Sequence, residues 1–118
     1  MGIEHIRNIA LIDNAEVTAL CDSNRTSIDN SLEVLKKNVP TFKSHINLME
    51  ADIADAYIIA TPNFTHINVL RDLIKTNAHL LIEKPLCTTV EDCKECGFGK
   101  YNDQTGQGAE SDCKKAYA

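Results

Sequence analysis

The sequence AYIIATPNFTH at residues 56–66, followed by HLLIEKPL at residues 79–86, decides the fold of this chain. Each stretch opens with a short apolar run of strand length and ends at a turn signal, Thr61-Pro62-Asn63 in the first and Glu83-Lys84-Pro85 in the second. Between the two stretches, one face of a predicted helix carries His66, Val69, Leu70, Leu73 and Ile74. A strand, a helix and a second buried strand in this order predict a parallel βαβ unit.

The residues before this unit repeat the same alternation. Apolar side chains at helical spacing predict an opening helix from Ile3 to Ile12, which Asp13-Asn14 would end. The run Glu16–Asp22 then predicts a buried strand that closes on an acid. Alternating helices and apolar strands indicate an α/β fold with a mostly parallel sheet.

A second helix is expected before the decisive stretch. Ser27 is its expected N-cap, and Pro40 would end it. The face that should be buried consists of Ile28, Leu32, Leu35 and Val39. Thr41-Phe42 then predicts a short strand, and Ser44 is placed to cap a brief helix that follows.

The end of the chain differs in composition from the rest. Thr88 or Thr89 is placed to cap a last helix from Val90 to Cys96. From Gly97 onward, glycines sit among polar residues with few aliphatic side chains. We therefore expect one ordered domain over residues 1–96 and a disordered or irregular tail over residues 97–118.

Bulk composition excludes several classes of protein. Of 118 residues, 43% are hydrophobic and 25% charged, which is typical of a globular domain. A net charge of −5 with scattered basic residues argues against nucleic acid as a main partner. No apolar run is long enough to span a membrane, and no secretory signal opens the chain, so we expect a cytoplasmic protein. Five cysteines, an odd number, indicate free thiols.

The polar residues of interest follow predicted strands, because parallel sheets bind ligands at the carboxyl ends of their strands. Asp22 closes the first predicted strand. A carboxylate there accepts hydrogen bonds from an adenosine ribose, although it serves equally well to cap a turn. It would also repel a 2′-phosphate, which favours NAD over NADP, while the nearby Arg25 weakens that preference.

Lys84 follows the last predicted strand, between an acid and a proline. A lysine held there can stabilise a developing oxyanion or relay a proton, but a lone lysine more often forms a surface salt bridge. Pro85 can set a sharp turn, in either the cis or the trans form. Cys93 and Cys96 have zinc-like spacing, but no second pair completes a site, so we expect incidental thiols and no metal.

Gly2 is the remaining candidate. A dinucleotide-binding fingerprint, G-x-G-x-x-G, lies between the first strand and the first helix. Gly2, at the mouth of the opening helix, matches the third glycine of such a motif. The alternative is that Gly2 merely follows the initiating methionine and has no binding role.

Four segments together resemble the amino-terminal domain of the Gfo/Idh/MocA family of NAD(P)-dependent oxidoreductases. They are residues 2–8, 17–22, 56–66 and 79–86, in the order and spacing of the family. The resemblance covers roughly residues 1–96. Thr61-Pro62-Asn63-x-x-His66 and Glu83-Lys84-Pro85, separated by one helix and one strand, are its most specific motifs.

The resemblance implies a Rossmann-like, doubly wound fold and a role for each candidate residue. Asp22 would contact the adenosine ribose, and Thr61, Pro62, Asn63 and His66 would line the cofactor groove. Glu83 and Lys84 would approach the nicotinamide ribose and the substrate, with Lys84 as the catalytic lysine. Family members transfer hydride to or from sugars, inositols and related polyols.

The chain also departs from the family pattern. The resemblance implies a first strand and most of the glycine loop before Gly2, and a second, substrate-binding domain after residue 97, and neither is present in this sequence. We therefore expect the chain by itself to lack activity and to be marginally stable, because the missing strand would lie at the centre of the sheet. A non-enzymatic fragment that binds a nucleotide or a partner is the alternative.

Overall fold

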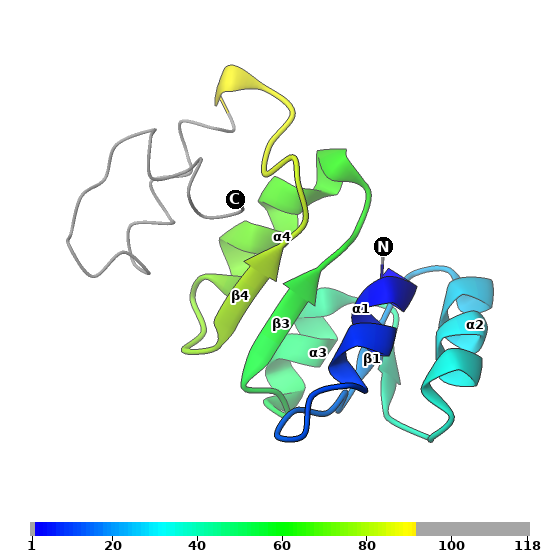
Figure 1. Ribbon diagram of the computed structural model, residues 1–118. Helices are drawn as coiled ribbons and strands as arrows, with labels where there is room; N and C mark the ends of the chain where they lie inside the picture. Colours follow the sequence, from blue (N-terminus) through cyan, green and yellow to red (C-terminus); the bar gives the residue numbers. More distant parts are fainter. Residues whose placement is uncertain (1, 92–118) are drawn as a thin grey trace. The chain divides into compact units, whose positions relative to one another are not determined.

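The strands expected from the sequence are present as two separate parallel pairs. The computed structural model describes residues 2–91, which form two compact units with their boundary between Ala54 and Asp55. In each unit, two strands are joined by a crossover that contains a helix (Figure 1). The parallel α/β architecture predicted from the sequence is therefore confirmed.

The first unit contains three helices and one pair of short strands. Its elements in chain order are α1 (Gly2–Ile9), β1 (Leu20–Cys21), α2 (Arg25–Leu35), β2 (Thr41–Phe42) and α3 (His45–Ala51). Helix α1 packs against α2, and β1 pairs with β2 in parallel. The short strand at Thr41-Phe42 and the cap of α3 by Ser44, whose hydroxyl accepts from the Ile46 amide, agree with the sequence prediction.

Helix α2 differs from its prediction at both ends. Its N-cap is Asn24, whose side chain accepts a hydrogen bond from the Ser27 amide at 3.2 Å, so Ser27 already lies inside the helix. The helix ends at Leu35 because Lys36 adopts a left-handed conformation, with φ of 59°. Val39 therefore lies outside the helix, and Pro40 comes too late to end it.

The first helix and the first strand are both shorter than expected. Helix α1 ends at Ile9, and Ile12 is exposed. Strand β1 covers only Leu20–Cys21 of the predicted run Glu16–Asp22. Residues 16–19 have no strand beside them in the described part of the chain, because β2 is only two residues long and pairs with Leu20–Cys21 alone.

The second unit is the βαβ unit predicted from the decisive stretch. Strand β3 (Ala56–Ile59) leads through a 3₁₀ turn, η1 (Asn63–Thr65), into helix α4 (His66–Leu73) and then into strand β4 (His79–Ile82). Strands β3 and β4 run parallel, with Tyr57 opposite Leu80 and Ile59 opposite Ile82. Both arrowheads point to the end at which η1 lies (Figure 1).

One face of the β3–β4 pair belongs to the core of the second unit. Tyr57, Ile59 and Ile82 are buried on this face, together with a stripe on α4 and two residues after β4. Those further core residues are Ile67, Leu70, Leu73, Leu86 and Cys87. Ile58 and Leu81, on the opposite face, are 37% and 49% exposed, so the strands are buried on one face and not on both as the continuous apolar runs suggested.

Strand pairing in the described residues occurs only within the two units. Among residues 2–91, β1 pairs only with β2, and β3 pairs only with β4, so each strand keeps one edge without a strand partner. The tail predicted over residues 97–118, and all but the start of the helix predicted from Val90 to Cys96, lie outside the described residues. None of the helices in the described range has the length and hydropathy needed to cross a bilayer.

Two cysteines fall in the described part of the chain, and they differ. Cys21 is a free thiol at the end of β1, as the sequence predicted. Cys87 is buried and disulfide-bonded, so the expectation of free thiols is wrong at this position. An odd cysteine count requires at least one unpaired thiol, but it does not exclude a disulfide among the others.

Candidate nucleotide-binding site

The turn after β3 is built from short-range hydrogen bonds. The Thr65 amide donates to the Pro62 carbonyl at 2.9 Å, which closes the 3₁₀ turn. The Thr65 hydroxyl lies 2.7 Å from both the Pro62 carbonyl and the Thr61 hydroxyl. Because a carbonyl only accepts, Thr65 donates to Pro62 and accepts from Thr61. Thr61, Pro62 and Asn63 are thus presented on an ordered, exposed turn.

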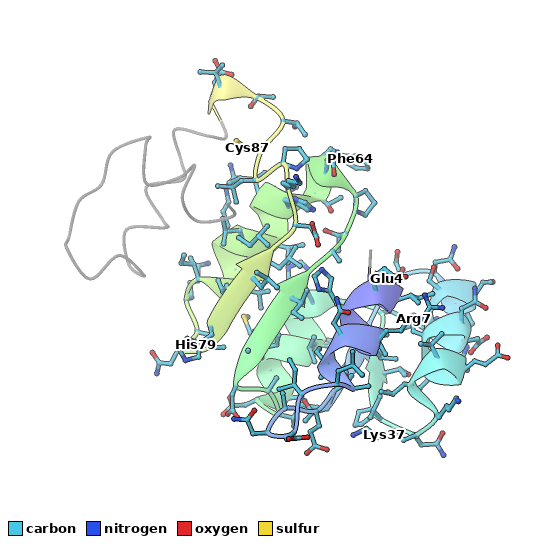
Figure 2. All side chains as sticks on the ribbon, viewed as in Figure 1. Glu4, Arg7, Lys37, Phe64, His79 and Cys87 are labelled. Atoms are coloured by element: carbon cyan, nitrogen blue, oxygen red, sulfur yellow. The ribbon has the colours of Figure 1, made fainter. Side chains whose placement is uncertain are left out.

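The turn after β4 lies at the same end of the second unit. Figure 2 shows Phe64, in η1, and Cys87 at this end, with His79 at the opposite end of the strand pair. The Glu83 amide donates to the Ile59 carbonyl at 2.9 Å, which extends the pairing of the strands by one residue. The Lys84–Pro85 peptide bond is cis, one of the two forms that the sequence allowed.

Lys84 is exposed on this turn. No salt bridge to Lys84 occurs within residues 2–91, so the surface ion pair considered from the sequence is not formed there. The residues that follow, Leu86 and Cys87, are buried at 1% and 9% exposure. These two side chains anchor the turn in the core, so the lysine is exposed on a fixed backbone.

His66 joins the two turns. Its Nδ1 lies 2.8 Å from the Pro85 carbonyl oxygen, and its Nε2 lies 2.8 Å from the Thr61 carbonyl oxygen. The side chain is fully buried, and it is the one buried polar residue in the described part of the chain. Thr61 and Glu83-Lys84-Pro85, which are distant in sequence, are therefore brought to one end of the unit.

Asp22 lies in the first unit, directly after β1. Its Oδ1 accepts a hydrogen bond from the Asn24 amide at 2.8 Å, so the carboxylate shapes the turn that leads into α2. The residue is exposed. The turn-capping role considered from the sequence is thus present, and it uses only one of the two carboxylate oxygens in the described interactions.

Asp22 also affects its neighbour. The pKa of the Cys21 thiol is raised, mainly because the thiol is partly buried and secondly because the Asp22 carboxylate lies beside it. Both effects disfavour the negatively charged thiolate. Cys21 is therefore poorly suited to be a nucleophile at neutral pH.

Gly2 is the first residue of α1 and is exposed. A Cβ atom built on Gly2 would meet no other atom within 4 Å. Packing within the described residues therefore does not require glycine at this position. A requirement for glycine would have to come from a ligand that approaches the backbone closely.

Some contributors to the site carried little signal in the sequence. Leu86 and Cys87 anchor the lysine turn, and only the apolar character of these two residues after Pro85 pointed to burial. The joining role of His66 was also missed, since the helical pattern placed it on the buried face without indicating its partners. Among described residues, no cluster of side chains suited to hold a metal ion occurs.

Comparison with known proteins gives a consistent result. The chain is 30% identical over 100 residues to a glycosyl hydrolase family 109 protein of Shewanella sp. (strain ANA-3), which covers 78% of this chain and 22% of that protein. The structure resembles the WlbA dehydrogenase of Bordetella pertussis, crystallised with NADH and UDP-GlcNAcA. The TM-score is 0.75 and the identity 28%, over 89% of this chain and 31% of that one.

A third protein shares the fold. The myo-inositol dehydrogenase of Lactobacillus casei, in complex with NAD(H) and myo-inositol, superposes with a TM-score of 0.76 at 24% identity, over 80% of this chain and 28% of that one. The chain thus spans between about a fifth and a third of the length of these relatives. Residues 1–97 match a family described as "Oxidoreductase family, NAD-binding Rossmann fold". Because this match covers most of the chain, the protein belongs to the Gfo/Idh/MocA oxidoreductase family.

Proposed function

We propose that this chain is the NAD-binding part of an oxidoreductase that acts on a sugar, an inositol or a related polyol. The observation that carries the proposal is the pair of joined turns after β3 and β4, which present Thr61-Pro62-Asn63 and the exposed Lys84 at one end of a parallel strand pair. The carboxyl ends of parallel strands are where α/β folds bind dinucleotides. UDP-GlcNAcA and myo-inositol, which are bound in the structures of these relatives, support a polyhydroxylated substrate.

The residues of the chain fit a dinucleotide. Gly2, where no packing opposes close approach, would face a phosphate at the start of α1. Asp22 would accept hydrogen bonds from the adenosine ribose through the carboxylate oxygen that the Asn24 amide does not use. Thr61, Pro62 and Asn63 would line the groove, and His66 would support them from the core.

Lys84 is the proposed catalytic residue, and Glu83 would help to hold the nicotinamide ribose. NAD, when bound, would accept the hydride. The Lys84 side chain would hydrogen-bond to the substrate oxygen, and its neutral amine form would accept the proton that leaves when a hydroxyl becomes a carbonyl. Its exposure and the absence of an ion pair in residues 2–91 leave this group available for that task.

The proposal includes a preference for NAD over NADP. The Asp22 carboxylate would repel a 2′-phosphate. Arg25, which could offset this repulsion, forms an ion pair with Asp29 at 3.0 Å on the surface of α2. We expect affinity for either cofactor to be weak, because Gly2 alone represents the glycine motif in this sequence.

Titration of NADH and NADPH by fluorescence or calorimetry tests the proposal. Wild type should bind NADH more tightly, and Asp22→Ala should weaken NADH binding about tenfold, the usual effect of losing a hydrogen bond to a charged group. Glu33→Ala, which removes another exposed acid of the first unit, is the matched control and should leave NADH affinity within about twofold. Equal affinities that Asp22→Ala does not change would remove Asp22 from the site.

We expect the chain to bind the cofactor without catalysing turnover. We expect the 118-residue chain alone to show no dehydrogenase activity, because hydride transfer requires the substrate to be held in register with the nicotinamide. The chain spans only 31% of the WlbA dehydrogenase. Polyol-dependent NAD reduction that the wild-type chain catalyses and Lys84→Ala abolishes would contradict this expectation.

A glycosidase reaction is the second candidate, favoured by the 30% identity to the glycosyl hydrolase family 109 protein. Some glycosidases depend on NAD, so the same cofactor site would serve either reaction. Assays of a longer protein that carries this sequence, with glycosides and with free polyols, distinguish the two substrate classes.

A further inference from the structure

We propose that His66 is a positioning residue, which clamps the turn after β3 to the turn after β4 and so fixes where Lys84 is presented. The two partners of the ring are carbonyl groups 24 residues apart in sequence, at Thr61 and Pro85. No other residue within 2–91 combines a polar side chain with full burial. The clamp itself is independent of the proposed function, and only its consequence for Lys84 rests on that function.

Each ring nitrogen of His66 lies against a backbone carbonyl oxygen. Both partners are carbonyl oxygens, which accept and never donate, and both lie at 2.8 Å. A ring with a single proton would satisfy one carbonyl and direct a lone pair at the other. At least one ring nitrogen therefore donates, and the ring bridges the two turns whichever nitrogen carries the proton.

The charged groups near the clamp are few. The turn after β3 has no charged side chain, whereas the turn after β4 carries the half-buried Glu83 and the exposed Lys84. Farther along α4, the charged side chains are Arg71 and Asp72. The clamp is therefore formed mainly with backbone carbonyl groups, which the fold supplies regardless of the neighbouring side chains.

The two contacts of His66 complete a closed ring of hydrogen bonds and backbone segments, called the circuit below, around the ends of β3 and β4. From the Ile59 carbonyl, the Glu83 amide leads along the chain to Pro85, whose carbonyl oxygen lies against Nδ1 of His66. The other nitrogen of His66 reaches Thr61, which returns along the chain to Ile59. Lys84 lies inside this circuit, held on both sides, so its backbone position depends on the histidine and not on the lysine side chain.

Nitrogen NMR of the wild-type chain with labelled histidine gives the first test. We expect at least one ring nitrogen of His66 to carry a slowly exchanging proton, in contrast to the exposed His79. Ring protons of His66 that exchange as fast as those of His79 would overturn the clamp. The measurement requires neither cofactor nor activity, so failure of the chain to bind NAD would leave it unaffected.

Local hydrogen exchange gives the second test, on His66→Gln, which places both amide protons on a single nitrogen. We expect the amides of Thr65 and Glu83 to exchange about tenfold faster, while the Ile74 amide within the α4 ladder changes less than about twofold. Leu70→Ala, a core control in α4, should speed exchange at all three amides together. A uniform effect of His66→Gln would show that His66 is only a core residue and would overturn the proposal.

Discussion

The two units of this chain are stabilised in different ways. In the first unit, α2 and α3 begin with side-chain caps from Asn24 and Ser44, and the strands are two residues long. In the second unit, the strands are four residues long, and α4 begins without a side-chain cap. Of the ten buried hydrophobic residues in the described range, two are in the first unit and eight in the second.

The two units thus differ in the sequence distance between the residues whose contacts stabilise them. The first unit relies on bonds between neighbours in sequence, whereas the second relies on burial of side chains that are distant in sequence. The candidate ribose-binding Asp22 belongs to the first unit and the candidate catalytic Lys84 to the second. We therefore expect the second unit to hold its own candidate residues more rigidly than the first holds Asp22.

The largest effect is expected from breaking the core of the second unit. Leu70, 3% exposed in α4, should lose about 2–5 kcal/mol of stability on replacement by alanine, through lost burial and the cavity that remains. Thermal unfolding combined with hydrogen exchange should locate the loss within residues 55–91. Leu11→Ala, at a position 83% exposed, is the control and should change stability by no more than about 0.5 kcal/mol. A similar result for both variants would mean that the second unit does not depend on its core.

A smaller effect should follow removal of a cap in the first unit. Asn24→Ala leaves the Ser27 amide without its partner and should cost about 0.5–2 kcal/mol. Increased exchange should be confined to α2 and its neighbours. Thr26→Ala, in the exposed first turn of the same helix, serves as the control. If exchange rose as much in the second unit, the two units would not be stabilised independently.

The charge of Asp22 gives a pH-dependent test of the first unit. Because the folded pKa of Cys21 is raised, its contribution to stability is present below the ordinary thiol pKa and is lost as pH rises through the raised value. Asp22→Asn removes the secondary, electrostatic cause and should speed alkylation of Cys21 by roughly twofold or more at mildly alkaline pH. Peptide mass spectrometry measures the rate at Cys21. An unchanged rate, matching that of Asp29→Asn, would leave burial as the sole cause.

The smallest effect is expected at the exposed Arg25–Asp29 ion pair. Asp29→Ala should lower stability by no more than about 0.5 kcal/mol, because both side chains are largely in water. The same change releases Arg25 and should narrow the preference for NADH over NADPH. Titration of the variant with both cofactors measures this change, and a wider preference would contradict the inferred role of Arg25.

The sequence predicted the second unit better than the first. Apolar runs at residues 56–60 and 79–82 with a helical stripe between them fix a parallel pair, because burial leaves few other arrangements. In the first unit, more than one residue is suited to begin or end a helix, so the helix boundaries are harder to predict. Asn24 and Ser27 are both good caps, and Asn24 is the one used. The left-handed Lys36 carries no glycine signal that would have revealed the end of α2.

The candidate site shows the same division. Residue types at strand ends were enough to nominate Asp22 and Lys84, because such positions face ligands in parallel sheets. The bonds that organise these positions were not predictable from residue type. His66 contacts backbone carbonyls, which every residue possesses, so its partners are fixed only by the tertiary fold.

Strand pairing in the second unit has a consequence for handling the chain in solution. Within residues 2–91, β3 pairs with β4 along one edge only, and its second edge offers backbone donors and acceptors to any extended segment. Ile58 and Leu81 add exposed apolar surface on the adjoining face. A strand supplied by another molecule would stabilise the folded form by mass action, so the melting temperature should rise with protein concentration. A melting temperature for this chain is then meaningful only together with the protein concentration at which it was measured.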